Sequence, residues 1–188
     1  MTSREPTSSS TASRPDLGSR PSPPVTAADR VRGPEGAPLV TVYADFECPW
    51  CGWLELKLRD LHVRVCFRHF PVKSKHPRAW PAARAVEAAA NQGAFWSMHD
   101  AVYDDQGRLE DPHLWARAQR LGLDLGRFVA DSRSDAIKAR IEQDFRTGIR
   151  AGVAATPTLF LPDGEQVSGR PDPALLERFR APRSGPAA

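Results

Sequence analysis

The chain has 188 residues, of which 40% are hydrophobic, and a formal net charge of +3 at pH 7. This length suits one domain, or one domain with an insertion. Its basic residues are dispersed, which argues against a nucleic-acid binder. No apolar run is long enough for a secretory signal or a membrane span. We therefore expect a cytoplasmic protein that contains no membrane span.

Both ends of the chain have the composition of disordered segments. Residues 1–38 are rich in Ser, Thr, Pro, Gly and Arg, and residues 181–188 look similar. Segments of this kind bury too little apolar surface to offset the entropy cost of folding. The sequence therefore predicts two disordered tails around a single domain at 39–180.

The first part of this domain has the pattern of a β-α-β unit. An apolar run at 39–43 predicts a buried strand, helical spacing follows at 51–61, and residues 63–70 alternate like a second strand before Pro71 ends it. Such a unit predicts a parallel strand pair with a right-handed crossover.

The pattern then changes to helices over about 77–152. Helices are predicted at 82–91, 95–104, 111–122 and 125–131, and a further helix follows a capping box at Ser132 and Asp135. Every fourth residue from Ile137 to Ile149 is apolar, which gives this last helix one buried face.

Strand character returns near the end of the domain. Residues 158–161 predict a strand, a turn at 162–164 leads to a hairpin partner at 166–168, and Asp172 caps a final helix. The resulting order is β-α-β, a helical block, and then β-β-α.

Two cysteines, Cys48 and Cys51, lie where the first strand meets the first helix. The free N–H groups and partial positive charge of a helix start favour a thiolate over a thiol. A pair with this spacing is typical of a dithiol/disulfide redox centre. Between them, Pro49 suits a helix start. Trp50 carries an indole that can only donate a hydrogen bond, so we expect it to offer apolar surface to a substrate chain.

A structural zinc site is an alternative interpretation. Cys48 and Cys51, followed by Cys66 and His69, fit a loose zinc-ligand spacing. Cys66 and His69 are three residues apart in a predicted strand, however, so their side chains should point to opposite faces. We therefore favour a redox site without a metal, and treat Cys66 as a small buried apolar residue.

Four motifs occur in order along the domain: YADFECPWC at 43–51, FRHFP at 67–71, FWSMHD at 95–100 and GVAATPT at 152–158. Together they resemble the DsbA-like thioredoxin-fold family of thiol:disulfide oxidoreductases. The resemblance implies an α/β thioredoxin-like fold with an inserted helical subdomain.

The resemblance also implies a cis peptide bond between Thr156 and Pro157 beside the dithiol. There the backbone would pair with an extended substrate segment as an added strand. Cys48 would attack, Cys51 would resolve the mixed disulfide, and the Cys48–Cys51 disulfide would be the only redox group. Protein thiols or disulfides would be the substrates, and we expect a monomer served by a redox recycling partner.

Small-molecule isomerases and transferases with this fold remain a second alternative, although they commonly carry a serine in place of the cysteine pair.

One departure from the family concerns proton transfer. Many relatives carry a buried acid six residues before the first cysteine, where this chain has Val42. Asp45 and Glu47 are nearby acids, and we expect both to lie on the surface of a turn. His69 and His99 belong to family-like motifs, and we expect both to be structural.

Overall fold

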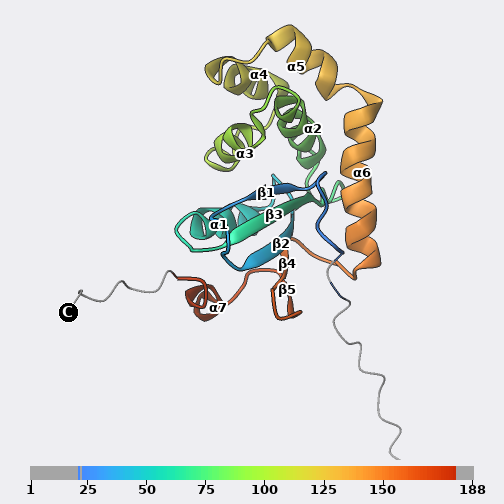
Figure 1. Cartoon of the computed structure of the whole chain (residues 1–188). Helices are drawn as coiled ribbons and strands as arrows, with labels where there is room; N and C mark the ends of the chain where they lie inside the picture. Colours follow the sequence, from blue (N-terminus) through green and yellow to red (C-terminus); the bar gives the residue numbers. More distant parts are fainter. Residues whose placement is uncertain (1–20, 22, 181–188) are drawn as a thin grey trace, which may run out of the picture.

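The computed structural model describes residue 21 and residues 23–180, and these form a five-stranded sheet with seven helices (Figure 1). The predicted tail at 181–188, together with residues 1–20 and 22 of the predicted N-terminal tail, lies outside the described residues.

The sheet is mixed, with strand order β1-β3-β2-β4-β5. Its strands are β1 (Arg30–Arg32), β2 (Leu39–Ala44), β3 (Arg64–His69), β4 (Thr158–Phe160) and β5 (Gln166–Ser168). β2 and β3 pair in parallel from Leu39 opposite Arg64 to Ala44 opposite His69, and the other pairs are antiparallel. The predicted β-α-β unit is confirmed, because one helix connects the parallel strands β2 and β3.

The helices divide into those beside the sheet and those above it in Figure 1. They are α1 (Pro49–Leu58), α2 (Ala79–Ala90), α3 (Phe95–Tyr103), α4 (Asp111–Arg120), α5 (Leu125–Ser132), α6 (Asp135–Arg150) and α7 (Pro173–Glu177). α1 and α7 lie to the left of the sheet, α6 to its right, and α2 to α5 above it. We call α2 to α6 the helical subdomain; its bounds agree with the predicted insertion at about 77–152.

The core runs from the sheet into the helical subdomain without a break. Most of α2 is buried, and its many alanines let the neighbouring helices α3 and α5 pack closely against it. Gly148 has a similar role in α6. A Cβ at this position would lie 2.8 Å from the Phe70 ring and 2.9 Å from the Tyr43 ring, so only glycine lets α6 approach the sheet this closely.

The predicted disordered tail at 1–38 is too long. Residues 30–32 form β1, which pairs with β3 and places Val31 opposite Cys66. Just before it, the buried Arg68 guanidinium donates to both carboxylate oxygens of Asp29, at 2.8 and 3.1 Å. Composition did not reveal this strand, because its two arginines are held by acids far along the chain.

One predicted cap was also wrong. Ser134, not Ser132, caps α6, since its side chain accepts a hydrogen bond from the Ile137 N–H at 3.3 Å. Ser132 instead ends α5 and donates to the Val129 carbonyl at 2.8 Å. The cap predicted at Asp172 is confirmed.

Within the described residues, no helix combines the length and the apolar character needed to cross a membrane.

Candidate functional site

Cys48 and Cys51 lie together at the start of α1. Cys48 is the N-cap residue, Pro49 follows at the first helical position, and Cys51 sits in the first turn. The Cys48 carbonyl accepts hydrogen bonds from the N–H groups of Cys51 at 3.1 Å and Gly52 at 3.2 Å. Both cysteines are free thiols, and the Cys51 thiol donates a hydrogen bond to the Cys48 sulfur.

The pKa of Cys48 is lowered to about 5. The hydrogen bond from the Cys51 thiol is the largest cause, and it outweighs the opposing effect of burial. Thr156 and the backbone N–H groups of Cys51 and Trp50 lower the pKa further. Because a thiol ionises above its pKa, Cys48 is a thiolate at neutral pH.

The pKa of Cys51 moves in the opposite direction, well above its ordinary value. Burial is the main cause, and the neighbouring Cys48 and the charge of Asp45 add to it. Cys51 therefore keeps its proton at neutral pH, so the two sulfurs of one turn differ in charge.

The two cysteines differ little in exposure. Cys48 is 4% exposed and Cys51 2%, so both are buried. The Cys48 sulfur lies 3.3 Å from the Thr156 carbonyl oxygen, so the Thr156–Pro157 loop covers it on one side. Pro49 and Trp50 are exposed beside it, Trp50 by 46%.

The Thr156–Pro157 peptide bond is cis, and this loop lies against the dithiol although more than one hundred residues separate the two segments. Pro157 is buried, and its carbonyl accepts a hydrogen bond from the Gly169 N–H at 2.7 Å. The structure therefore brings together Cys48, Cys51, Thr156 and Pro157, as the resemblance implied.

Sequence reasoning missed Arg170, which follows Gly169. Its guanidinium lies 4.9 Å from the centre of the Trp50 ring and 4.8 Å from that of Trp53, a geometry that allows cation–π attraction to both. Trp53 and Arg170 also line a surface pocket of about 630 Å³. The Arg170 cation thus lies over two indoles of α1, the helix that carries the redox pair.

The expectation that Asp45 lies on the surface was wrong. Asp45 is 1% exposed, and its backbone N–H donates to the Cys51 sulfur at 3.4 Å. One carboxylate oxygen accepts from the Val72 N–H at 2.8 Å and faces His76 Nδ1 at 2.9 Å. The one available signal in the sequence was the position of Asp45 directly after a buried strand.

Glu47 is only partly buried, and its carboxylate holds Arg78, whose Nε lies 3.0 Å from it. The turn before Cys48 is therefore fixed by two acids rather than left open to solvent.

The zinc alternative is not supported by the geometry. Cys66 is fully buried in the middle of β3, and His69 Nε2 is engaged by Glu87 at 3.0 Å. Within the residues the structure describes, neither joins Cys48 and Cys51 in a cluster of possible metal ligands.

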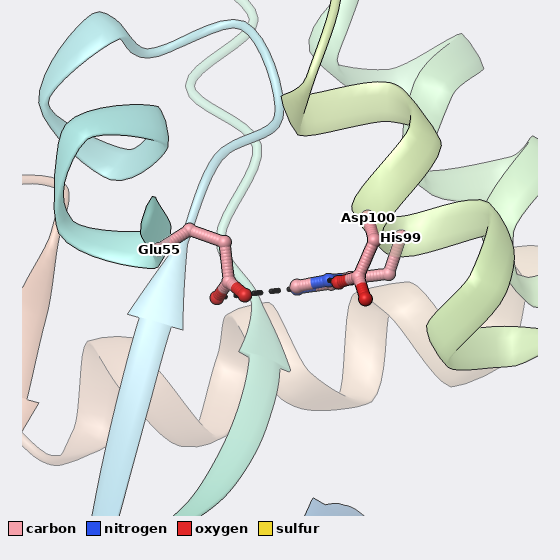
Figure 2. A group of neighbouring side chains, drawn as sticks. All are labelled: Glu55, His99 and Asp100. Atoms are coloured by element: carbon pink, nitrogen blue, oxygen red, sulfur yellow. Dashed lines mark hydrogen bonds and ion pairs between the residues drawn. The ribbon is translucent and has the colours of Figure 1, made fainter. Parts of the chain in front are cut away.

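A different cluster of possible ligands brings Glu55 of α1 close to His99 and Asp100 of α3 (Figure 2). Arg32 of β1 pairs with both carboxylates, and Arg59 pairs with both as well. These two cations already neutralise the acids that a metal would need. We therefore interpret the cluster as an ion-pair network that ties α1 to α3.

His69 and His99 are both buried among aromatic rings, and burial lowers the pKa of His99.

Residues 39–179 match the family described as the DSBA-like thioredoxin domain. The chain belongs to this family. A thioredoxin-like oxidoreductase from Silicibacter pomeroyi DSS-3 is 26% identical to this DSBA-like protein, with a TM-score of 0.72 over 81% of this chain and 90% of that one. The thiol-disulfide exchange protein α-DsbA2 from Wolbachia pipientis is 19% identical, with a TM-score of 0.70 over 81% and 85%, and supports the fold alone.

Curated relatives of this DSBA-like chain are much longer proteins. It is 46% identical over 142 residues to a protein named Na(+)/H(+) antiporter NhaA 3 from Salinispora tropica, and 42% identical over 170 residues to an NhaA antiporter from Herminiimonas arsenicoxydans. The matches cover 71% and 84% of this chain but only 21% and 27% of those relatives. The chain thus spans about a quarter of their length.

Proposed function

We propose that this protein is a thiol–disulfide oxidoreductase that exchanges disulfides with protein substrates through Cys48 and Cys51. The observation that carries the proposal is the opposite shift of two adjacent thiols: the pKa of Cys48 falls to about 5, while that of Cys51 rises. Thiol–disulfide exchange needs one thiolate that attacks and a second thiol that acts later.

In the reducing direction, the Cys48 thiolate attacks one sulfur of a substrate disulfide. The substrate S–S bond breaks, one substrate thiolate leaves, and a mixed disulfide to Cys48 forms. Cys51 then loses its proton and attacks the Cys48 sulfur, which releases the second substrate thiolate and forms the Cys48–Cys51 disulfide. Two electrons pass from the pair to the substrate, so no further cofactor is needed. The reverse sequence oxidises a substrate dithiol.

The neighbours of the pair support roles in substrate binding for Thr156, Pro157 and Trp50. The Thr156 carbonyl lies 3.3 Å from the attacking sulfur, where an extended chain could align with the backbone of this loop. The exposed ring of Trp50 offers apolar surface next to it. Pro49 fixes the backbone between the two cysteines.

A cytoplasmic location, a monomeric state and a recycling partner stay predictions from the sequence. A reducing cytoplasm would hold the pair as the dithiol and favour the reductase direction. The small-molecule isomerase or transferase alternative is disfavoured because both cysteines are present, whereas such enzymes commonly carry a serine in their place.

Insulin reduction, followed by the turbidity of the released B chain, tests the proposal. We expect wild type and Cys66→Ser to be active, and Cys48→Ser and Cys51→Ser to lose turnover. Cys66→Ser is the matched control, because Cys66 is buried in the sheet. Equal activity of wild type and Cys48→Ser would contradict the mechanism. A glutathione redox titration read by tryptophan fluorescence would then give the direction.

A further inference from the structure

Gln106 reaches from the helical subdomain to the start of α1. It lies in the loop between α3 and α4, and its Nε2 donates to the carbonyl oxygens of Phe46 at 2.8 Å and Cys48 at 3.0 Å. A primary amide has two N–H donors. Both N–H groups of the Gln106 amide therefore bond backbone carbonyls in the turn at the start of α1.

Gly52 provides a second, independent observation. It is buried within α1 and has ordinary helical geometry, so its backbone conformation does not require glycine. A Cβ at this position would lie 2.1 Å from Gln106 Oε1 and 2.7 Å from its Cδ. The missing side chain at Gly52 therefore makes the space in which the amide of Gln106 sits.

The loop that carries Gln106 is held from behind by Arg117. This arginine is 2% exposed, and its guanidinium donates to three backbone carbonyls of that region, those of Ala101 at 3.0 Å, Asp105 at 2.7 Å and Arg108 at 2.5 Å. These hydrogen bonds hold the loop that carries Gln106 in place, so the position of Gln106 depends on the packing of α3 and α4.

The Cys48 carbonyl is the first hydrogen-bond acceptor of α1. The Cys48 Cα lies in the plane of this peptide unit, so hydrogen bonds that hold the carbonyl also restrain the direction in which the Cys48 side chain leaves the backbone. That direction keeps the sulfur against the N–H groups of Trp50 and Cys51, which favour its thiolate. The titratable groups that interact with the cysteine pair come from α1, the preceding turn and α3, and none of them is altered by replacing Gln106: Cys51, Asp45 and Tyr103.

We propose that Gln106 is a positioning residue for thiol–disulfide exchange: through its amide, the helical subdomain holds the Cys48 end of α1 in the orientation in which the sulfur reacts. This inference rests on the proposed function and adds a role for the inserted helices in tuning it.

The test replaces Gln106 by methionine, which keeps the length of the side chain and removes both donors. The readout is the pH dependence of Cys48 alkylation by iodoacetamide in the reduced Cys66→Ser protein. We expect Gln106→Met to shift the midpoint upwards and to slow alkylation at acidic pH about tenfold, which corresponds to one pKa unit. Gln92→Met is the matched control, because the Gln92 amide also bonds backbone groups within the helical subdomain, those of Asp124 at 3.2 and 2.9 Å.

Gly52→Ala probes the same contact from the other side. The added methyl should displace the Gln106 amide and shift the midpoint in the same direction as Gln106→Met. If both variants titrate like wild type, or if Gln92→Met shifts the midpoint as much as they do, the role of Gln106 is contradicted. If Cys48 of the wild-type protein titrates as an ordinary thiol, the proposed function itself fails, so the two failures are distinguishable.

Discussion

The backbone N–H of Asp45 points at the sulfur of Cys51 across 3.4 Å, and the carboxylate of the same residue is buried beside it. A buried charge acts more strongly than an exposed one, because little water screens it. Asp45 therefore helps to hold the proton on Cys51.

Replacing Asp45 by asparagine should lower the pKa of Cys51, because the substitution removes a negative charge and keeps a side chain able to accept hydrogen bonds. The measurement is a pH titration of the Cys51 carbon resonances by NMR in the reduced protein. Glu47→Gln is the control, since the carboxylate of Glu47 is paired with Arg78. An unchanged titration in Asp45→Asn would show that this charge does not reach the sulfur.

Cys48 should be the one cysteine that reacts at neutral pH. Its pKa of about 5 predicts that alkylation of the reduced protein rises to half its maximum near that pH. Burial raises the pKa of Cys66 to about 12 and that of Cys51 well above its usual value, so both should stay unmodified. Mass spectrometry of the labelled protein across the pH range checks this. A midpoint near that of a free cysteine, about 8.5, would contradict it.

Glu87 should make the fold sensitive to acid. Its pKa is lowered to about 2, because hydrogen bonds from His69 and Arg30 outweigh the effect of burial. The unfolded chain would bind this proton near pH 4.5, so the stabilisation is complete above that pH and is lost as the pH falls towards 2. Urea unfolding at several pH values should show a smaller acid loss in Glu87→Gln than in wild type. Parallel curves for the two proteins would exclude this role.

The ion pair between Asp29 and Arg68 should stabilise the N-terminal part of the fold. Both side chains are almost fully buried, so Asp29→Asn should lower the free energy of unfolding by about 1 to 3 kcal/mol. Asp163→Asn breaks an exposed pair with Arg178 and should change little. Chemical denaturation compares the two variants, and equal losses would argue that burial does not matter here.

Metal analysis separates the redox proposal from a structural zinc site. Because His69 is bonded to Glu87 and Cys66 lies within the sheet, the reduced protein should carry far less than one zinc per chain. Stoichiometric zinc that is lost in Cys48→Ser would overturn this expectation.

The sequence predicted the fold well where apolar periodicity reports a buried face, as in β2, β3 and the first part of α6, where Ile137 and Ile141 are buried; the prediction was wrong at Ile149, which is 53% exposed near the end of that helix. It also located the cysteine pair, and the family resemblance added the Thr156–Pro157 loop. It failed where a polar side chain is buried by partners far along the chain. Strand β1 is an example, because Arg30 pairs with Glu87 and Arg32 with Asp100. Asp45 and Gln106 were missed for the same reason: their surroundings exist only after folding.

The arginines of β1 also bear on how the protein should be shortened for structural work. The family match begins at residue 39, and a fragment cut there would lose β1 entirely. The buried carboxylate of Glu87 would keep only its histidine neighbour, and the hydrogen-bonding edge of β3 would be open to pairing with other molecules. Such a fragment should aggregate, whereas one that starts before Pro23 retains the backbone carbonyls that Arg68 binds.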